Sequence, residues 1–453
     1  MKEFIIGLTT ISCIIKNNYL IGVYMFRDLL NKKKKIAVVG LGYVGLPLAK
    51  LLSTKFDVIG FDISEFKIES YKNGIDIIEG DSLDEFDILF TSDEKELANA
   101  NFIIVTVPTP ITDDNVPDLT FIESSTETVA RNMPKDSIVV YESTVYPGVT
   151  EDICIPILEE GSGFKCGEDF KVGYSPERAV PGKNNKRIEE ITKVVSGMDD
   201  ESLDIIANVY DSVLNNGIFK AKSIKIAEAA KITENIQRDV NIALVNELSK
   251  IYNTMGININ DVIETAGTKW NFVKYQPGLV GGHCIGIDPY YLIYQSDKLG
   301  CVANLMKTSR QVNESMVYYV HDNIVGILAQ NDVDINDADI LVCGVTFKEN
   351  CNDIRNSKII EIIKKLKESG ANIVLNDPNA IPEELERIHN LNLSEKYDTK
   401  FDAIVIGVAH SEYENLTVND FKSISKDKII LFDLKETVRE EFENKDDVVY
   451  WSL

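Results

Sequence analysis

A turn-rich segment at residues 274–289 carries the side chains best suited to covalent chemistry, Lys-Tyr-Gln-Pro-Gly-Leu-Val-Gly-Gly-His-Cys-Ile-Gly-Ile-Asp-Pro. Glycines and prolines at this density indicate backbone that is held close to a ligand. Cys284 lies in this segment, and a cysteine attacks as its thiolate, which a nearby lysine, imidazolium or helix N-terminus favours. Lys231 or His283 could supply that charge. The other cysteines fit the usual role of small buried apolar residues.

A second glycine-rich segment, with Gly40, Gly42 and Gly45, follows an apolar strand pattern and opens a helix-like run. The first glycine permits a tight turn, the second lets backbone approach a pyrophosphate, and the third allows close helix–strand packing. Asp62 ends the next predicted strand about 20 residues further on, where an acid can bond both ribose hydroxyls. An acid there would repel the 2′-phosphate of NADP, so the pattern predicts NAD binding. Without Asp62, the glycines would indicate only a tight turn.

Residues 223–256 predict one long helix, because no proline or internal glycine interrupts them. At 1.5 Å per residue this helix would be on the order of 50 Å long, which suits a connector between domains or a dimer core. Four polar residues recur at helical spacing on one of its faces: Glu228, Lys231, Asn235 and Arg238. Such a stripe is usually solvated. Here an inward-facing Asn235 and the cysteine segment favour a buried functional face.

A dinucleotide site together with a candidate thiol nucleophile indicates oxidation at the aldehyde level. Loss of a hydride from a thiohemiacetal gives a thioester, which water then cleaves. A two-electron hydroxyacid dehydrogenase is an alternative, but it needs neither the cysteine nor a second Rossmann-like domain. A non-catalytic NAD or nucleotide-sugar sensor is another alternative, and a protein that only binds has no need of Cys284.

Composition excludes several other classes of protein. Asp and Glu number 72 against 47 Lys and Arg, which gives a formal net charge of −25, so we expect no nucleic-acid binding. The 7 cysteines include no CxxC pair and predict neither a disulfide framework nor a metal site, so we expect reduced thiols in the cytoplasm. The apolar run at residues 4–15 falls short of the roughly 20 residues that a transmembrane helix requires. We therefore expect no stable membrane insertion.

Strands alternate with helices in two stretches of the chain, which predicts an α/β fold with two Rossmann-like, doubly wound parallel-sheet domains. A helical middle domain with one long central helix joins them. The expected boundaries are residues 35–222, 223–330 and 331–453. Residues 1–34 form an extension in which Met25 is the alternative start. We interpret residues 1–24 as a non-native or over-called extension, and a short membrane-associating segment is the alternative interpretation.

Taken together, these motifs resemble the UDP-glucose/GDP-mannose dehydrogenase family over about residues 35–440. The motifs occur in order: Gly40–Gly45, Ser143-Thr144-Val145-Tyr146-Pro147-Gly148, Ser175-Pro176-Glu177-Arg178, Lys231-x-x-x-Asn235-x-x-Arg238, Gly281-Gly282-His283-Cys284 with Asp288, and Phe347-Lys348 with Asp353-x-Arg355. The resemblance implies that two NAD in succession oxidise the primary alcohol at carbon 6 of a nucleotide sugar to a carboxylate.

The resemblance also implies the role of each residue. Cys284 would be the nucleophile. Lys231, supported by Asn235, would act as proton donor and acceptor or would stabilise the developing oxyanion. Asp288 would help to activate the hydrolytic water, which Thr144 and Glu177 would place. The residues expected to contact NAD are Gly40, Gly42, Tyr43, Val44, Gly45, Asp62, Lys67, Thr109, Thr144 and Arg355. The residues expected to hold the UDP-sugar are Glu177, Arg178, Lys231, Asn235, Arg238, Tyr275, Gly278, Phe347, Lys348 and, by a looser match, Lys435.

Three stretches resemble the branch that acts on UDP-N-acetylhexosamines: Lys269-Trp270-Asn271-Phe272, Gly286-Ile287-Asp288-Pro289-Tyr290-Tyr291-Leu292 and Phe347-Lys348-Glu349-Asn350-Cys351. This resemblance implies UDP-GlcNAc or UDP-GalNAc as substrate and surface polysaccharide as the destination of the product. The UDP-glucose branch typically has Phe where Arg178 stands. UDP-glucose and UDP-ManNAc are the alternative substrates. Because apolar residues occur on more than one side of the helix at 223–256, we also expect a homodimer or higher homo-oligomer.

Overall fold

The structure is a computed structural model that describes residues 24–78, 80–178, 188–394, 397, 399–443 and 445–453. These residues form two compact units. The first contains the described residues up to 234 together with 290–295, and the second contains 235–289 and the described residues from 296 onward. Helix α7 (Ile224–Thr254) begins in the first unit and ends in the second. No helix in the described ranges is long and apolar enough to cross a membrane.

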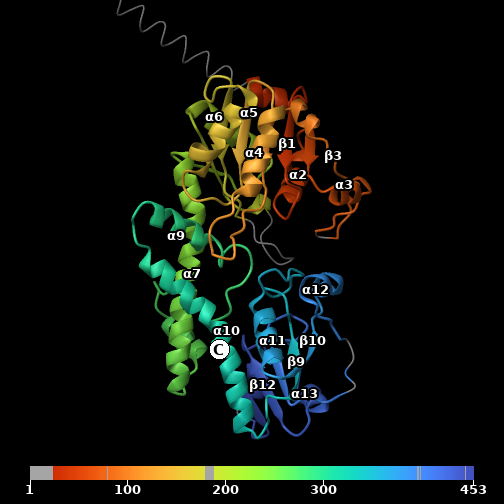
Figure 1. Ribbon diagram of the computed structural model, residues 1–453, viewed down its shortest axis with the longest axis vertical. Helices are drawn as coiled ribbons and strands as arrows, with labels where there is room; N and C mark the ends of the chain where they lie inside the picture. Colours follow the sequence, from red (N-terminus) through yellow and green to blue (C-terminus); the bar gives the residue numbers. More distant parts are fainter. Residues whose placement is uncertain (1–23, 79, 179–187, 395–396, 398, 444) are drawn as a thin grey trace, which may run out of the picture. The chain divides into compact units, whose positions relative to one another are not determined.

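The first unit is built on a sheet with the strand order β3-β2-β1-β4-β5-β6-β7-β8 (Figure 1). All neighbouring strands are parallel except β6 and β7. The sequence order reverses between β1 and β4, which is where a Rossmann sheet binds its dinucleotide. The strands are β1 (Lys35–Val39), β2 (Val58–Phe61), β3 (Ile88–Thr91), β4 (Ala100–Val105), β5 (Ser137–Tyr141), β6 (Phe170–Tyr174), β7 (Lys193–Gly197) and β8 (Ile218–Lys220).

Helices in the described residues connect the strands of this sheet: α2 (Gly45–Ser53), α3 (Glu65–Lys72), α4 (Thr120–Asn132), α5 (Ile155–Ser162) and α6 (Asp200–Asp211). Apolar residues of α2 and α6 share one core cluster with alternate residues of the central strands, as expected where one face of a strand is covered by helices. Helices α4 and α5 pack against each other (Figure 1). Residues 24–30 are also helical, and Met25 and Leu29 are buried in the same core.

The second unit carries a sheet with the order β10-β9-β11-β12-β13, in which every neighbouring pair is parallel. Numbered within its own sheet, this is the 2-1-3-4-5 order, which has its switch point between β9 and β11. The strands are β9 (Asp339–Cys343), β10 (Asn372–Asn376), β11 (Ala403–Ile406), β12 (Ile429–Asp433) and β13 (Val448–Trp451).

Helices cover both faces of this second sheet (Figure 1). Ile340, Val342 and their neighbours pack with α10 and α11 on one face, whereas Leu341, Cys343 and their neighbours pack with α13 and α14 on the other. The helices of this unit are α8 (Ile259–Ala266), α10 (Asn304–Gln330), α11 (Lys358–Glu368), α12 (Pro382–His389), α13 (Val418–Ile424) and α14 (Arg439–Phe442). Helix α9 (Asp288–Lys298) contributes residues to both units.

The structure confirms the predicted α/β fold with two parallel-sheet domains and a helical middle region. The predicted helix at 223–256 matches α7 to within two residues at each end. The sequence did not indicate the antiparallel pairing of β6 with β7. Our interpretation of residues 1–24 concerns a segment that, apart from Tyr24, lies outside the described residues.

Candidate active site

The glycine loop after β1 has the backbone geometry expected of a dinucleotide site. Gly40 has a φ of +94°, and a Cβ at Gly45 would lie 1.9 Å from the Gly40 carbonyl oxygen, so the tight turn and the close helix–strand approach both require glycine. A Cβ at Gly42 would meet nothing within 4 Å. The space beside Gly42 is therefore open to an approaching pyrophosphate.

Asp62, which follows β2, lies beside this loop. Its Oδ2 accepts the Leu41 N–H at 2.9 Å and lies 3.1 Å from Lys67 Nζ, while its Oδ1 accepts the Ser64 N–H at 2.9 Å. The carboxylate is thus anchored to the loop that would carry the pyrophosphate. Asp62 and Lys67, both predicted to contact NAD, therefore form an ion pair at the end of β2.

Thr109 and Thr144 follow β4 and β5, which are parallel neighbours. The carboxyl ends of parallel strands meet at one edge of a sheet, so both residues lie at the edge that carries the glycine loop and Asp62. Ser143 donates its hydroxyl to the Val107 carbonyl at 2.6 Å and ties the two loops together. The structure therefore gathers the predicted cofactor residues of the first unit along one edge.

Glu177 belongs to a buried ionic cluster that the sequence did not reveal. Lys193 Nζ lies 2.6 Å from Glu142 Oε2 and 3.4 Å from Glu177 Oε2, and the Tyr210 hydroxyl donates to the other oxygen of Glu142. Burial acts to lower the pKa of Lys193, but the carboxylates of Glu142 and Glu177 outweigh it and hold that pKa above its ordinary value. The Lys193 ammonium therefore fixes the carboxylate of Glu177. Glu142 directly precedes the Ser143-Thr144 motif, and this position could have identified it as a site residue. Lys193 lies in no motif, so the sequence offered no comparable indication for it.

Arg178 is held in the first unit by a carboxylate on α7. Its guanidinium forms a two-pronged ion pair with Glu234, with Nε 3.2 Å from Oε2 and Nη2 2.8 Å from Oε1, while Nη1 donates to the Thr192 carbonyl at 3.1 Å. Arg178 was predicted to hold the UDP-sugar. The structure adds Glu234 as the residue that orients it.

The polar stripe on α7 is buried, as predicted, for Glu228, Lys231 and Asn235. Arg238 is exposed instead, and the neighbouring Asp239 continues the buried stripe. Glu228 accepts the backbone N–H groups of Gly148 and Thr150 at 2.6 and 3.0 Å, and burial raises its pKa to about 7. Helical spacing from Asn235 is compatible with either Arg238 or Asp239, because residues three and four apart both share its face, so spacing alone did not identify Asp239.

Asp239 anchors α10 within the second unit. Its Oδ1 lies 2.5 Å from Nη1 of the buried Arg310, and Asn313 donates to the same oxygen at 2.8 Å. This buried charge is thus paired and hydrogen-bonded, as burial of an ion requires. Asp239 therefore has a structural role that Arg238 lacks.

The cysteine segment ends where α9 begins, and the junction is tied to α7. The Asp288 N–H donates to the Cys284 carbonyl at 2.8 Å, and the Asp288 Oδ2 accepts from the Asn235 amide at 2.5 Å. Asp288 and Asn235 are buried, whereas Cys284 is exposed. Asn235 therefore positions the carboxylate predicted to activate water, while the thiol stays accessible to a substrate.

Within the second unit, the cysteine segment packs against the loop after β9. A Cβ at Gly282, whose φ is +78°, would lie 2.8 Å from the Phe347 ring, so this close approach requires glycine. Burial lowers the pKa of Lys348, and the charges of nearby acidic groups, including that of Cys284 as thiolate, act in the opposite direction. Lys348 therefore lies within electrostatic reach of Cys284.

His283 is a poor source of positive charge for that thiolate. Burial and the nearby Arg355 lower the pKa of His283, although its Nδ1 lies 3.7 Å from Asp353 Oδ2. Arg355 forms a two-pronged pair with Asp353, with distances of 2.9 and 2.8 Å. His283 is consequently neutral at pH 7.

Gly278 and Lys435, both predicted to hold the UDP-sugar, lie against each other. Lys435 Nζ donates to the Pro277 carbonyl at 2.9 Å, and a Cβ at Gly278 would lie 2.2 Å from that nitrogen. The buried Asn246 amide bonds both the carbonyl and the N–H of Gly278, at 3.0 and 2.8 Å. Asn246 extends the buried stripe of α7 and is a supporting residue that the sequence analysis missed.

The predicted residues divide between the two units. The first unit contains Gly40, Gly42, Tyr43, Val44, Gly45, Asp62, Lys67, Thr109, Thr144, Glu177, Arg178 and Lys231. The second contains Asn235, Arg238, Tyr275, Gly278, Cys284, Asp288, Phe347, Lys348, Arg355 and Lys435. Arg355, predicted to contact NAD, is thus in the unit that carries the cysteine. Lys231 and Asn235 are one turn apart on α7.

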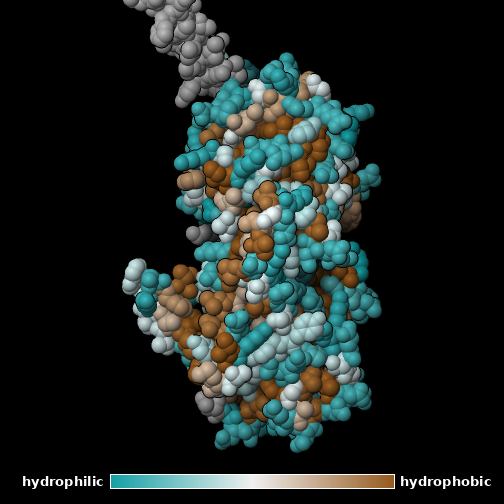
Figure 2. All heavy atoms as spheres, turned by 60° about the vertical axis from the view of Figure 1, so that its left-hand side comes forward, coloured by the Kyte–Doolittle hydropathy of each residue, from teal (hydrophilic) through white to brown (hydrophobic). Residues whose placement is uncertain are grey.

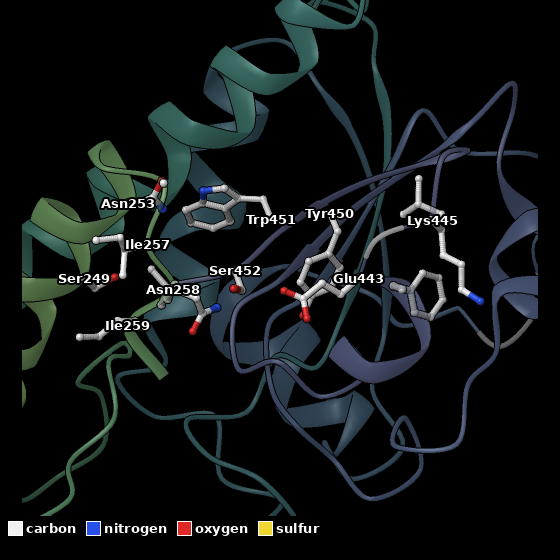
Figure 3. A pocket seen from close by; sticks show the side chains of 14 residues that line it. Ser249, Asn253, Ile257, Asn258, Ile259, Glu443, Lys445, Tyr450, Trp451 and Ser452 are labelled. Carbon is white, nitrogen blue, oxygen red and sulfur yellow. The ribbon is translucent and has the colours of Figure 1, made fainter. Parts of the chain in front are cut away.

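A pocket of about 360 Å³ lies in the second unit between the end of α7 and β13 (Figure 3). Asn253 and Ile257 line it from one side, and Tyr450 and Trp451 line it from the other. None of its lining residues, all within the described ranges, is a predicted site residue. The pocket is therefore separate from the predicted chemistry.

Three segments match the three domains of the UDP-glucose/GDP-mannose dehydrogenase family. Residues 34–214 match the NAD binding domain, 225–315 the central domain, and 341–440 the UDP binding domain. Together these matches cover most of the chain and follow the family's domain order.

Individual relatives agree with this match. The chain is 47% identical to Protein CapL of Staphylococcus aureus over 89% of its own length and 96% of that protein. It is 42% identical to UDP-N-acetyl-D-glucosamine 6-dehydrogenase of Salmonella typhi, covering 88% of this chain and 96% of the relative. The solved structure of UDP-D-ManNAc dehydrogenase from Pyrococcus horikoshii aligns with a TM-score of 0.83 at 29% identity, covering 92% of this chain and 98% of that one.

Proposed function

The chain belongs to the UDP-glucose/GDP-mannose dehydrogenase family, and from that premise we propose that its substrate is UDP-GlcNAc or UDP-GalNAc. The chain is an NAD-dependent nucleotide-sugar 6-dehydrogenase of the UDP-N-acetylhexosamine branch. The proposed reaction is a four-electron oxidation of carbon 6 to a carboxylate through a thioester on Cys284. The packing of the Cys284 segment against Phe347 in the UDP-binding segment carries this proposal.

Bound NAD would supply the hydride acceptor for each of the two oxidations at carbon 6. The open space beside Gly42 and the anchored carboxylate of Asp62 fit a pyrophosphate and a ribose, respectively. We assign Lys67, Thr109 and Thr144 to the same cofactor, and Arg355 from the second unit. We assign residues 34–214 to NAD binding, residues 225–315 to catalysis and oligomer assembly, and residues 341–440 to UDP-sugar binding.

The chemistry on the sugar uses Cys284 and Lys231. Lys231 accepts the proton of the carbon 6 hydroxyl as each hydride leaves, and it returns a proton to the oxygen when the thiolate adds to the aldehyde. That addition forms the carbon–sulfur bond, and the second oxidation converts the thiohemiacetal to a thioester. Water placed by Thr144 and Glu177 and activated by Asp288 then adds to the thioester carbon. The carbon–sulfur bond breaks, which releases the carboxylate and regenerates the thiolate.

The choice of sugar rests on Arg178 and on the relatives. The guanidinium that Glu234 orients offers fork-like donors that suit hydroxyl and acetamido oxygens alike, so the preference for an acetamido sugar rests on the resemblance of the Ser175–Arg178 motif to the N-acetylhexosamine branch. The relative called a UDP-N-acetyl-D-glucosamine 6-dehydrogenase is 42% identical, against 29% for the structure called a UDP-D-ManNAc dehydrogenase. UDP-ManNAc and UDP-glucose are the alternative substrates.

The deciding experiment measures NADH formation with UDP-GlcNAc, UDP-GalNAc, UDP-ManNAc, UDP-glucose and GDP-mannose. A site built for an acetamido group should use UDP-glucose at least about a hundredfold less efficiently in kcat/KM. A preference for UDP-glucose or GDP-mannose would overturn the substrate assignment. Two NADH per sugar are expected, and one NADH per sugar would instead favour a two-electron dehydrogenase.

We propose that the product serves surface polysaccharide biosynthesis and that the reaction takes place in the cytoplasm. Similarity to Protein CapL supports the first point. The described cysteines are free thiols, which is typical of a reducing compartment. Detection of the uronic acid in isolated surface glycan, and its loss when the gene is deleted, would test the pathway.

We propose that the protein is a homodimer or higher homo-oligomer that uses the second half of α7. Figure 2 shows hydrophobic residues exposed among hydrophilic ones on the face that it draws. In the second unit, Leu244, Ile251 and Met255 are exposed along α7 and just beyond it, and Trp270 is 91% exposed. Light scattering at micromolar concentration should give at least twice the monomer mass. Leu244→Asp should lower that mass, and a monomeric wild-type protein would contradict the proposal.

A further inference from the structure

We propose that His410 and Asp377 position the loop that carries Phe347 and Lys348, and so set the affinity for the UDP-sugar. This proposal deepens the proposed function and rests on it. His410 and Asp377 belong to none of the motifs that the sequence analysis identified. They nevertheless meet at the switch point of the second sheet, where loops after β9, β10 and β11 come together.

Asp377 holds the start of the loop. Its Oδ2 accepts the N–H groups of Val345 and Thr346 at 2.6 and 3.3 Å. Its Oδ1 accepts the N–H groups of Asn379 and Ala380, both at 2.8 Å. The carboxylate, which follows β10, is thus fixed by its own turn and in turn fixes the first residues after β9.

His410 holds the end of the loop. This fully buried side chain follows β11, and its Nδ1 accepts the Asn350 N–H at 3.0 Å. Because a nitrogen that accepts carries no proton, the hydrogen of the neutral ring lies on Nε2. Nε2 is 3.2 Å from Asp377 Oδ2, so the ring donates to the carboxylate that holds the other end.

The middle of the loop is joined to the same pair. Nε2 of His410 is also 3.2 Å from the Thr346 hydroxyl oxygen, and that hydroxyl donates to the Lys348 carbonyl at 2.9 Å. The Cys351 thiol donates to the same carbonyl at 3.3 Å. The backbone on both sides of Phe347 and Lys348 is therefore fixed through one buried histidine–aspartate pair.

This pair is a positioning device and not part of the chemistry. Phe347 reaches the cysteine segment at Gly282, and Lys348 lies within electrostatic reach of Cys284. A loop that loses its anchor moves both side chains away from the sugar nucleotide, whereas Cys284 and its tie to Asp288 stay in place. Loss of the anchor should consequently weaken binding of the UDP-sugar more than it slows the chemical step.

The two ring nitrogens can be tested separately. An Asn side chain places an acceptor near the position of Nδ1, and a Gln side chain places a donor near that of Nε2. His410→Ala should raise the KM for the UDP-sugar about tenfold, as expected for one lost hydrogen bond to the loop. Its kcat and its KM for NAD should stay within about twofold of wild type. His410→Asn should restore most of the affinity because it keeps the Asn350 bond, and His410→Gln should not.

The chain offers a matched control in His321, which lies on α10 in the same unit. Its Nδ1 is 2.9 Å from Asp322 Oδ1 and its Nε2 is 2.9 Å from the Ser369 hydroxyl, so it forms a histidine–aspartate pair away from the loop. His321→Ala should leave both KM values unchanged. Thermal unfolding of each variant identifies any that fails to fold. If His410→Ala does not fold, the comparison of His410→Asn with His410→Gln still decides the proposal.

Calorimetric titration with UDP separates this inference from the proposed function. A His410→Ala protein that binds UDP as tightly as wild type, or that loses kcat at unchanged KM, would overturn the inference while the substrate assignment stands. Rescue by His410→Gln and not by His410→Asn would also overturn it. If wild type oxidises no UDP-N-acetylhexosamine but His410→Ala weakens UDP binding, the proposed substrate is wrong and the positioning role is retained.

Discussion

The two sheets place an aspartate at corresponding positions and use it differently. Asp62 follows β2 and Asp377 follows β10, and each of these strands lies next to the first strand of its sheet. Both aspartates are 7% exposed. Each accepts a backbone N–H from the loop after that first strand, from Leu41 in one sheet and from Val345 in the other. The two aspartates therefore share their position and their overall burial, although the side chain of Asp377 is fully buried and that of Asp62 is 8% exposed.

The difference lies in the donors that the protein supplies. Asp62 accepts from the Leu41 and Ser64 N–H groups and from the Lys67 ammonium. Asp377 accepts from His410 and from the N–H groups of Val345, Thr346, Asn379 and Ala380. A carboxylate offers about four lone-pair sites. Donors of the protein therefore occupy all the lone-pair sites of the Asp377 carboxylate, whereas the Asp62 carboxylate can still accept hydrogen bonds from the hydroxyls of a ligand.

The largest expected effect is that of Cys284→Ala, which should abolish the chemistry in the second unit and leave NAD binding in the first unit intact. Cys284→Ala should reduce acid formation by about four orders of magnitude or more, because no thioester can form. NAD affinity, measured by calorimetry, should remain close to wild type. Cys284→Ser should accumulate an ester visible by intact-protein mass spectrometry, since an alkoxide leaves less readily than a thiolate. Wild-type turnover in Cys284→Ala would refute the nucleophile assignment.

Replacing each aspartate by asparagine should lower the free energy of unfolding by different amounts at the two positions. Both oxygens of Asp377 accept backbone N–H groups, so in Asp377→Asn the amide NH2 group would point at a donor whichever way the side chain is turned. The free energy of unfolding should therefore fall by about 3–5 kcal/mol. In Asp62→Asn the same change should cost less than about 1 kcal/mol, because fewer donors surround the side chain. Urea denaturation of the two variants measures the difference. Equal losses would mean that donor number does not distinguish the two sites.

A third buried acid, Glu228, holds loop N–H groups as Asp377 does but carries a raised pKa of about 7. A raised pKa favours the protonated form in the folded state, so its stabilising effect is complete below the ordinary pKa of 4.5 and is lost as pH rises through about 7. Relative to Glu228→Gln, the wild type should lose on the order of 3 kcal/mol of unfolding free energy between pH 5 and pH 8. Denaturation curves at the two pH values test this, and a constant difference would contradict it.

The smallest expected effect concerns the spare capacity of Asp62. Asp62→Asn keeps one acceptor oxygen but loses the charge that strengthens its bonds to ribose, so the KM for NAD should rise about tenfold. The ratio of kcat/KM for NAD over NADP should fall, since the repulsion of a 2′-phosphate disappears. Initial rates with both cofactors measure the two effects. A wild-type preference for NADP would refute the role of Asp62.

The sequence was sufficient for features that local chemistry determines. The alternation of strands and helices predicted both sheets, and the uninterrupted run at 223–256 predicted α7. Of the polar stripe on α7, Lys231 and Asn235 are buried as predicted, whereas Arg238 is exposed. Spacing gives the face of a helix to within one residue, so it could not choose between Arg238 and Asp239.

The supporting residues could not be predicted because their partners are distant in sequence. In the folded protein the Lys193 ammonium contacts the carboxylates of Glu142 and Glu177, and the His410 ring contacts Asp377 and the Asn350 N–H. Nothing in the residues next to Lys193 or His410 distinguishes them from other lysines and histidines. Their roles arise only in the folded sheets. Lys193 begins β7, and its antiparallel pairing with β6 brings Lys193 to the edge where β5 and β6 end. His410 follows β11, which runs parallel to β9 and so ends at the same edge of the second sheet.

By itself the sequence identified the groups proposed for the chemistry: a glycine turn with Asp62 for NAD, and a thiol in a turn-rich segment as the proposed nucleophile. Such signals are local, because a turn needs particular residues at fixed spacing and a nucleophile needs a particular atom. Only the tertiary structure decided how those groups are held, with Asp377 saturated and Asp62 left with spare acceptors. That distinction depends on how many donors converge on each carboxylate, and in Asp377 three of them, Val345, Thr346 and His410, come from loops that follow other strands of the folded sheet.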